Sequence, residues 1–285
     1  MKIENEVCVM EFVHKGGEML SMMDKETGVQ FLYQGDTSYW GGKNPTLFPI
    51  VGNTFDGTYV AKGKTYTFKN HGLIRYATLE CIAHKQDSIT FELKADEETL
   101  KAYPYAFTYH ITYTLEGKKV LIDYDITNND TEAMPFTFGL HPGFKAPLLK
   151  DETYEDFTIA FEQEEHAKQL VFHNVEKPYE KEVVFKSIPL NYEQLKQYQT
   201  LVFKNIQSAY VVLQGKGKQG IKIKISGYPF LAIWSPLNAP FVCIEPWYSH
   251  ADYEPVDGAF KDREGMMELA PNETFTTSYS IEIVG

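Results

Sequence analysis

Hydrophobic and polar residues alternate with a period of two along much of the chain. Across residues 107–126 the apolar positions fall on one face of each of two strands: Phe107, Tyr109, Ile111 and Tyr113 before a turn at Glu116-Gly117, and Val120, Ile122, Tyr124 and Ile126 after it. This pattern predicts an antiparallel hairpin. Residues 210–225 repeat it around a turn rich in glycine and lysine, and residues 273–284 alternate as a further strand.

Helical signals are few and short. Residues 96–103 predict one or two helical turns, and residues 191–198 predict a short helix capped by Asn191. Residues 19–35 predict two more strands joined at Lys25 to Gly28. Because strand patterns recur from end to end without a repeat or a linker, the expected fold is an all-β sandwich with a few short helices, in a single domain spanning residues 1–285.

Composition and charge narrow the class of protein. A chain of 285 residues that is 43 % apolar can bury a sizeable core, and its formal net charge of −12 argues against a nucleic-acid or anionic-membrane partner. No apolar run approaches the roughly 20 residues that cross a bilayer, and the first residues alternate too regularly for a signal peptide. Cys8, Cys81 and Cys243 form an odd, widely spaced set, which favours reduced thiols in a soluble cytoplasmic protein.

Four segments interrupt the alternation. They are residues 40–53 (WGGKNPTLFPIVGN), 70–75 (NHGLIR), 138–144 (FGLHPGF) and 241–249 (FVCIEPWYS). They share glycine or proline beside a polar residue, and such neighbours hold a side chain in one orientation. Loops between rigid strands commonly carry binding and catalytic residues. We therefore expect the functional side chains in these four segments.

The titratable residues of these segments each have a functional and a structural interpretation. A carboxylate buried in the apolar stretch around Glu245 needs a raised pKa or hydrogen-bond donors, so Glu245 is either a catalytic group or a structural carboxylate bonded to backbone amides. His141 and His71 are either catalytic groups or core histidines bonded to backbone carbonyls. Arg75, one of two arginines in the chain, is either a ligand-binding group or a surface ion-pair partner.

Trp40, Trp234 and Trp247 lie in or beside the same segments. Aromatic faces next to fixed polar groups are typical of sugar sites, because the C–H faces of a sugar pack against them. Three tryptophans of an ordinary core would show the same sequence pattern. The aromatic residues therefore suggest a carbohydrate ligand without requiring one.

The order and spacing of the segments follow a known pattern. The matching stretches are LFPIVGN (47–53), GTY and GKTYTFKNHGLIR (57–75), FGLHPGF (138–144), LAIWSPLNAPFVCIEPWYS (231–249) and LAPNETFTTSYSIEI (269–283). In this order they resemble the aldose 1-epimerase (galactose mutarotase) superfamily, in particular its LacX-like branch. The resemblance implies a β-supersandwich of large antiparallel sheets with a cleft that binds a sugar.

The resemblance also implies a reaction, the interconversion of the α and β anomers of a hexose or related sugar without a cofactor. By motif position, Glu245 would be the general base for the C1 hydroxyl, His141 the general acid for the ring oxygen, and His71 a group that hydrogen-bonds the sugar near that oxygen. The expected sugar-binding residues are Arg75, Lys43, Asn53, Trp234 and Trp247, and no residue is assigned to a metal. Opening a hemiacetal needs one group that accepts a proton and one that donates a proton, which suits these residue types.

Two other classes of function stay open at this point. A protein with the same cleft can bind a carbohydrate, as a sensor does, without converting it. His71, His141 and Glu245 also match a two-histidine, one-carboxylate metal site in residue type, although no short ligand motif joins them. The sequence names neither the sugar nor the oligomeric state, and a phosphorylated sugar held by Lys43 or Arg75 remains an alternative.

Overall fold

The computed structural model describes residues 1–217, 219–256 and 259–285, and strands dominate it. Its main sheet has 15 strands, paired antiparallel. Along the path of this sheet they are β4 (Thr46–Leu47), β12 (Gly139–Leu140), β20 (Phe241–Trp247), β19 (Phe230–Trp234), β16 (Thr200–Lys204), β14 (Thr158–Val171), β17 (Tyr210–Gln214), β18 (Gly220–Lys224), β22 (Thr274–Val284), β10 (Lys119–Asn128), β9 (Phe107–Glu116), β8 (Ser88–Lys94) and β7 (Glu80–His84), with β13 (Gly143–Lys145) beside β20 and β15 (Tyr179–Pro189) beside β14.

Besides the main sheet, the described residues form three smaller sheets and five short helices. The sheets are β1 (Lys2–Glu4) with β2 (Cys8–Phe12) and β3 (Met19–Asp24), β5 (Thr58–Ala61) with β6 (Lys64–Thr67), and β11 (Met134–Phe136) with β21 (Met267–Leu269). The helices are α1 (Glu97–Ala102), α2 (Tyr192–Tyr198) and the 3-10 turns η1 (Ile74–Tyr76), η2 (Tyr154–Asp156) and η3 (Phe260–Asp262). No helix in the described part of the chain is long and apolar enough to cross a membrane.

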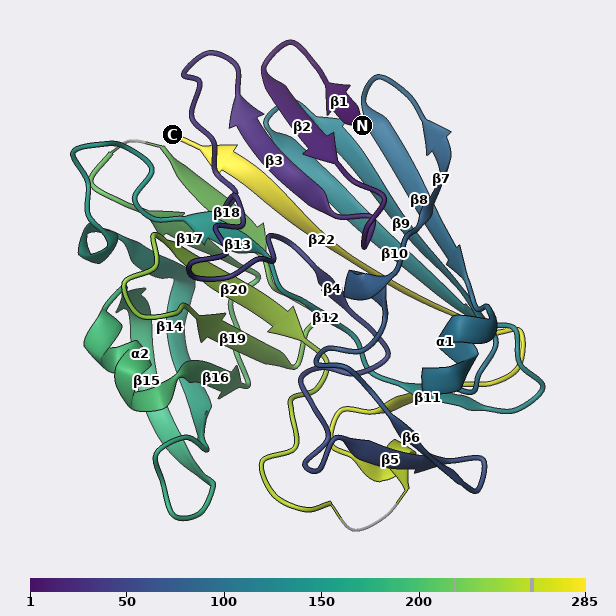
Figure 1. Ribbon diagram of the computed structural model, residues 1–285. Helices are drawn as coiled ribbons and strands as arrows, with labels where there is room; N and C mark the ends of the chain where they lie inside the picture. Colours follow the sequence, from purple (N-terminus) through teal and green to yellow (C-terminus); the bar gives the residue numbers. More distant parts are fainter. Residues whose placement is uncertain (218, 257–258) are drawn as a thin grey trace.

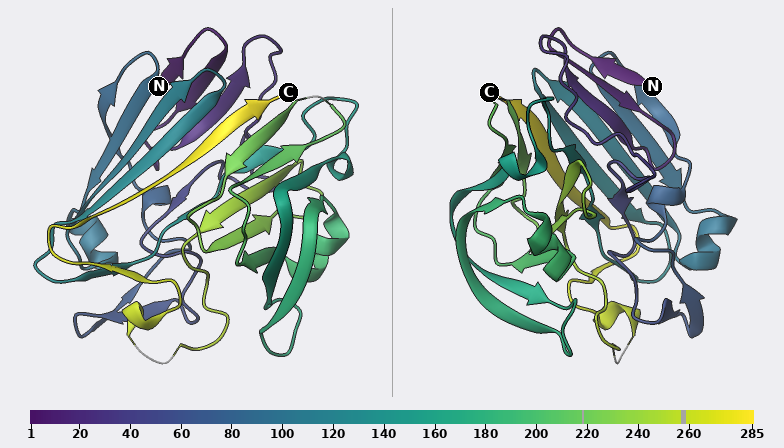
Figure 2. Two further views of the ribbon diagram at one scale, coloured as in Figure 1. Left: turned by 180° about the vertical axis from the view of Figure 1, so that it is seen from behind. Right: turned by 60° about the vertical axis from the view of Figure 1, so that its left-hand side comes forward.

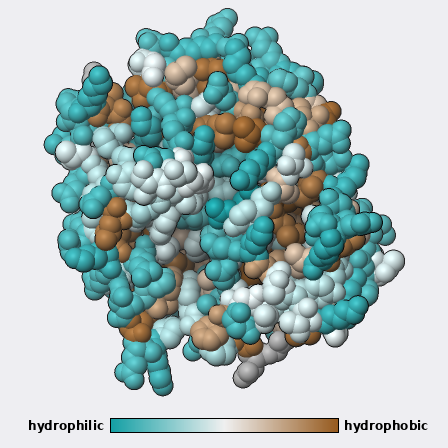
Figure 3. Space-filling model, in the orientation of Figure 1, coloured by the Kyte–Doolittle hydropathy of each residue, from teal (hydrophilic) through white to brown (hydrophobic). Residues whose placement is uncertain are grey.

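The main sheet bends so that its two halves form layers (Figures 1 and 2). One continuous core of buried apolar side chains draws on both halves, including Ile244 of β20 and Ile111 of β9. The β1–β3 sheet packs on the half of the main sheet that contains β9, where the ring of Phe12 in β2 lies 4.7 Å from that of Tyr113 in β9. Outside the core, hydrophilic residues cover much of the face shown in Figure 3.

The all-β fold predicted from the alternation is confirmed, and so are most of its local elements. β9 and β10 pair from Glu116 and Lys119 onward as the predicted hairpin. β17 and β18 pair as predicted, while residue 218 of their connection lies outside the described residues. Both predicted helices are present, and the side chain of Asn191 caps α2 by accepting a hydrogen bond from the amide of Glu193.

One predicted strand is wrong. After β3, residues 29–35 make only single bridges, between Gln30 and Met23 and between Leu32 and Phe144. The side-chain oxygen of Gln30 accepts hydrogen bonds from the amides of Met22, at 2.9 Å, and Leu32, at 3.0 Å. A side chain that bonds to nearby backbone in this way competes with the ladder of a sheet.

The strand β20 is buried on both faces, and this double burial positions the site. Side chains alternate along a strand. Val242 and Ile244 project into the main core, whereas Cys243, Glu245 and Trp247 project from the opposite face. A carboxylate at position 245 is therefore held on a rigid, central strand away from bulk water.

Candidate active site

The four irregular segments of the sequence meet at one cavity of about 690 Å³. It lies on the face of β20 that carries Glu245. Among its lining residues are most of the predicted site residues: Asn53, His71, Arg75, His141, Trp234, Glu245 and Trp247. Lys43 is not among the described residues that line the cavity. The tertiary fold thus brings together predicted site residues that lie up to 194 positions apart in sequence, from Asn53 to Trp247.

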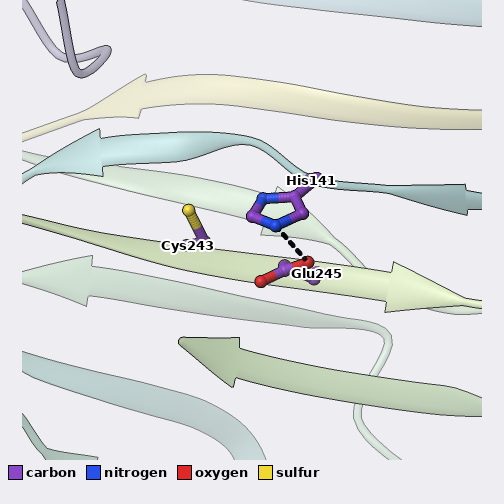
Figure 4. Close-up of side chains that lie close together, drawn as sticks. All are labelled: His141, Cys243 and Glu245. Carbon is purple, nitrogen blue, oxygen red and sulfur yellow. Dashed lines mark ion pairs between the residues drawn. The ribbon is translucent and has the colours of Figure 1, made fainter. Parts of the chain in front are cut away.

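Glu245 and His141 form a buried pair at this cavity. Nε2 of His141 lies 3.3 Å from Oε2 of Glu245, and the residues are 6 % and 1 % exposed (Figure 4). The contact is close but is not aligned as a hydrogen bond, and neither Oε2 of Glu245 nor Nδ1 of His141 has a hydrogen-bond partner in the described structure. Buried polar atoms without partners are rare in folded proteins and often mark a functional site.

Backbone contacts hold His141 in place above β20. Its amide donates a 3.1 Å hydrogen bond to the carbonyl of Pro45, and the amide of Gly143 donates one of 2.8 Å to the carbonyl of Lys43. A side chain at Gly139 would meet the ring of Trp247 at 2.7 Å and is excluded. The segment 138–144 is therefore fixed against the segment 40–53, which fixes the direction of the imidazole.

Burial shifts the two pKa values in opposite directions. It raises the pKa of Glu245 well above that of an ordinary carboxyl group, an effect that the positive charge of Arg75 opposes. Burial also lowers the pKa of His141 well below that of an ordinary imidazole, with smaller contributions from His71 and Arg75. Desolvation disfavours any charged form, so it favours the proton on Glu245 over the proton on His141. Transfer of that proton across 3.3 Å produces a carboxylate and an imidazolium.

His71 is a neutral hydrogen-bond donor with a defined tautomer. The amide of Gly52 donates a 2.9 Å hydrogen bond to Nδ1 of His71, so Nε2 carries the ring proton. Burial lowers the pKa of His71 to about 3, with a smaller effect of Arg75, and the ring stays uncharged near neutral pH. The His71 ring lies 5.3 Å from the His141 ring and perpendicular to it.

Three tryptophans form the walls next to the pair. The ring of Trp40 stacks on His141 at 4.7 Å, and Trp234 meets the same imidazole edge-on at 5.6 Å. Trp247 donates a 3.1 Å hydrogen bond from Nε1 to the carbonyl of Leu140. The sequence grouped Trp40 with the aromatic residues that suggest a sugar ligand but did not include it among the expected sugar-binding residues, and the structure shows that its ring stacks on the imidazole of His141.

Arg75 and Lys43 have different positions. Arg75 lines the cavity from η1, and its guanidinium has no ion-pair partner among the described residues. Lys43 contributes its backbone, since its amide donates a 2.9 Å hydrogen bond to the partly buried carboxylate of Glu18. Arg75 is the one lysine or arginine among the described residues that line the cavity.

Asp252 lines the cavity although the sequence did not suggest it. Its Oδ2 accepts hydrogen bonds from the amide of Phe55, at 3.1 Å, and from Nε of Arg263, at 3.0 Å. In sequence it is an ordinary acid in a polar loop, without the glycine or proline neighbours that marked the other segments. Only its place after β20 brings it to the cavity.

The side chains that lie close enough together to bind a metal ion are not the set His71, His141 and Glu245 that the sequence suggested. Within the described residues, one group of possible ligands lies within 4.8 Å: His141, Cys243 and Glu245. His71 is outside this group, and its Nδ1 is occupied by the amide of Gly52. Burial raises the pKa of the Cys243 thiol, which disfavours the thiolate that metals bind. This environment does not fit a metal site well.

Comparison with known proteins gives one consistent result. The aldose 1-epimerase family model matches residues 1–282. Protein LacX (plasmid) of Lactococcus lactis subsp. lactis is 29 % identical over 300 residues, which cover 100 % of this chain and 99 % of LacX.

Solved structures agree with this match. A galactose mutarotase related enzyme from Lactobacillus acidophilus has a TM-score of 0.94 and 30 % identity, over 100 % of this chain and 97 % of its own. A galactose mutarotase-like protein from Lactobacillus casei ATCC 334 has a TM-score of 0.89 and 26 % identity, over 99 % of each chain. These matches confirm the resemblance predicted from the sequence segments.

Proposed function

The chain belongs to the aldose 1-epimerase family, and on this premise we propose that it interconverts the α and β anomers of a hexose or related sugar by acid–base catalysis. The observation that carries the proposal is the buried pair of Glu245 and His141, 3.3 Å apart and facing a cavity. A protein that only binds sugars gains nothing from burying a carboxylate oxygen without a hydrogen-bond donor, which costs free energy.

Ring opening uses both members of the pair. The carboxylate of Glu245 takes the proton of the C1 hydroxyl, the C1–O1 bond becomes a carbonyl, and the bond between C1 and the ring oxygen breaks. The imidazolium of His141 gives its proton to that ring oxygen. The open-chain aldehyde is then bound by a protonated Glu245 and a neutral His141, the proton arrangement that burial favours.

Ring closure reverses these steps on the other face of the aldehyde. After rotation about the C1–C2 bond, His141 takes the proton of the ring hydroxyl as its oxygen attacks C1. Glu245 returns its proton to the carbonyl oxygen, which becomes the C1 hydroxyl of the other anomer. The protein ends with its protons where they began, so the reaction needs no further reactant.

Two neighbours assist the pair in this mechanism. The Nε2–H of His71 donates to the ring oxygen and stabilises the negative charge that develops when the C1 bond breaks. The guanidinium of Arg75 lowers the pKa of Glu245 and so increases the fraction of carboxylate. Trp40 and Trp234 exclude water from the imidazole.

The charges around the cavity support a neutral sugar. Arg75 is the one lysine or arginine among the described lining residues, and the carboxylates of Glu245 and Asp252 line the same cavity. A phosphate group would need several donors or cations to offset its charge. Lys43, which the sequence offered as a second cation, does not line the cavity in the described structure.

Polarimetry of freshly dissolved α-glucose and α-galactose tests the proposed function. The wild-type protein should accelerate mutarotation of at least one sugar, and Glu245→Gln should abolish the acceleration. Glu162→Gln, at an exposed strand carboxylate outside the cavity, is the matched control and should leave the rate unchanged. Acceleration that survives Glu245→Gln would remove Glu245 as the base. No acceleration with glucose, galactose or glucose 6-phosphate would reject the epimerase and favour a carbohydrate-binding protein.

A further inference from the structure

Glu18 lies in the tight connection between β2 and β3 and is not among the described residues that line the cavity. Its Oε1 accepts hydrogen bonds from two consecutive amides, that of Lys43 at 2.9 Å and that of Asn44 at 2.5 Å. Hydrogen bonds from backbone amides to a carboxylate are charge-assisted and stronger than those between neutral groups. The Glu18 carboxylate therefore holds the backbone of residues 43–44 in place.

The connection that carries Glu18 is anchored to the core. The hydroxyl of Tyr113 donates a 2.9 Å hydrogen bond to the carbonyl of Gly17, and this contact is buried. The amide of Gly16 donates a 2.8 Å hydrogen bond to the carbonyl of Ala77, in the segment that follows η1. The Glu18 side chain thus joins an anchored loop at one end to the segment 40–53 at the other.

The carbonyl groups of the same short stretch hold His141. The carbonyl of Lys43 accepts a 2.8 Å hydrogen bond from the amide of Gly143, and the carbonyl of Pro45 accepts one of 3.1 Å from the amide of His141. Residues 43–45 therefore lie between Glu18, which binds their amides, and the segment 138–144, which binds their carbonyls. A single stretch of backbone separates Glu18 from the proposed general acid.

Trp40 belongs to the same segment and adds a side-chain contact to these backbone contacts. Its ring stacks on the imidazole of His141 at 4.7 Å, and a Cβ at Gly143 would lie 3.3 Å from the Trp40 ring. A shift of residues 40–45 would therefore move both the backbone that orients the imidazole and the ring that covers it. A misplacement of about 1 Å in an active site can lower the rate about 10²-fold.

The Glu18 carboxylate and the two amides depend on each other. Burial raises the pKa of Glu18, and the hydrogen bonds from the amides of Asn44 and Lys43 oppose this effect more than the charge of Arg75 does. A carboxylate withdrawn from water needs hydrogen-bond donors, and an amide withdrawn from water needs an acceptor. Without the Glu18 side chain, the two amides lose their acceptor, and the segment must move to bind water instead.

We propose that Glu18 is a positioning residue of the epimerase, which holds residues 43–45 where their carbonyl groups orient His141. Glu18 neither touches the sugar nor exchanges a proton with it. The role requires an acceptor oxygen at the right reach and no negative charge, so a glutamine amide oxygen can fill it. This inference rests on the proposed function and adds to it a residue from outside the cavity.

Mutarotation kinetics of three Glu18 variants test this role, with the sugar that the wild type accelerates. Glu18→Ala should lower kcat at least about tenfold, because His141 is displaced, and should change KM less than about threefold, because Glu18 does not line the cavity. Glu18→Gln should keep kcat within about threefold of the wild type. Glu18→Asp keeps the charge but is one methylene shorter, so its kcat should fall below that of Glu18→Gln.

Three kinetic results would overturn the positioning role. They are a kcat of Glu18→Ala close to that of the wild type, a loss that appears in KM instead of kcat, and a kcat of Glu18→Gln lower than that of Glu18→Asp. The last result would mean that the charge matters and the reach does not. Thermal unfolding shows whether each variant is folded, and Glu18→Asp replaces Glu18→Ala in every comparison if the alanine variant does not fold.

Glu152→Ala is the matched control for losing a carboxylate that binds backbone amides. Oε2 of Glu152 also accepts hydrogen bonds from two consecutive amides, that of Leu148 at 3.2 Å and that of Leu149 at 3.0 Å, and Glu152 does not line the cavity. Glu152→Ala should leave kcat and KM at their wild-type values. A loss of kcat as large as that of Glu18→Ala would overturn a specific role of Glu18.

Hydrogen exchange separates this role from a failure of the proposed function. In peptides that cover residues 138–144, the amides of His141 and Gly143 should exchange at least about tenfold faster in Glu18→Ala than in the wild type. They should exchange at the wild-type rate in Glu18→Gln, and the amides of β9 serve as the unchanged reference. If the wild type accelerates no sugar, the epimerase is rejected and exchange alone decides whether Glu18 positions His141. Unchanged exchange in Glu18→Ala would overturn the inference in either case.

Discussion

The amide of Gly52 donates a 2.9 Å hydrogen bond to Nδ1 of His71, and the carbonyl of Gly52 accepts one of 2.8 Å from the His71 amide. This reciprocal contact joins the segments 40–53 and 70–75 at the cavity. It places the ring proton of His71 on Nε2 and holds the residue at a positive φ of 65°. Histidine and asparagine adopt this backbone region more readily than most residues.

Replacing His71 by asparagine should impair catalysis without unfolding the chain. Asparagine tolerates the positive φ but does not place a donor at the position of Nε2. Loss of a donor to a developing oxyanion costs about 10²–10³-fold in rate, and we expect a fall in kcat of at least tenfold in a mutarotation assay. His166→Asn, at an exposed strand residue, is the control and should match the wild type. An unchanged kcat for His71→Asn would show that this ring makes no contact in the transition state.

The same histidine should make the fold sensitive to acid. Its pKa falls from 6.5 in the unfolded chain to about 3 in the folded protein because of burial. Below pH 6.5 the His71 ring is protonated in the unfolded chain but stays neutral in the folded protein. The free energy of unfolding therefore falls as the pH drops from 6.5 towards 3. Between pH 7 and pH 5 this one group should cost about 2 kcal/mol of unfolding free energy.

Denaturant unfolding at both pH values measures this effect. Between pH 7 and pH 5, the unfolding free energy of His71→Asn should fall by about 2 kcal/mol less than that of the wild type. This difference does not depend on the stability of the variant at pH 7. The comparison isolates His71, because His141 and the other titratable groups are common to both proteins. Identical pH dependence in the two proteins would mean that the pKa of His71 is the same in the folded protein as in the unfolded chain.

Gly52→Ala should disturb the site more than a comparable glycine substitution elsewhere. A Cβ at Gly52 would lie 2.4 Å from the Cβ of Ala251, and the φ of Gly52 is +71°. Gly57 has a φ of +77° but no atom within 4 Å of its Cβ position, so Gly57→Ala reports the backbone strain alone. That strain is about 1 kcal/mol.

Thermal unfolding and mutarotation assays separate the two glycine variants. Gly52→Ala should lower Tm further than Gly57→Ala and should also lower activity, because the clash moves the loop that carries Asp252 away from His71. Equal losses in both variants would show that the loop moves aside freely.

Removing metal ions should leave the activity intact. The thiol of Cys243 lies beside Glu245, but burial raises its pKa and keeps it protonated. Dialysis against a chelator, and the substitution Cys243→Ala, should each change kcat less than about threefold, as measured by polarimetry. Loss of activity in both experiments, restored by added zinc only in the wild type, would instead assign His141, Cys243 and Glu245 to a metal.

The sequence alone determined the elements and the chemical candidates. Alternation of apolar residues predicted β9, β10, β17, β18 and β22, because one buried face forces a period of two. Interruptions by glycine and proline marked the four segments that reach the cavity, because these residues fix unusual backbone geometry. Glu245 and His141 stood out because a polar side chain in an apolar stretch needs a reason to be buried.

Only the tertiary structure decided which of these residues meet. Lys43 and Arg75 are equivalent cations in sequence, yet the packing of Glu18 against the backbone of Lys43 leaves Arg75 at the cavity. Asp252 and Phe172 carry no local signal, and strand pairing far apart in the chain brings them to the same wall. Contacts between distant segments depend on sheet order and register, which local patterns of polarity do not encode.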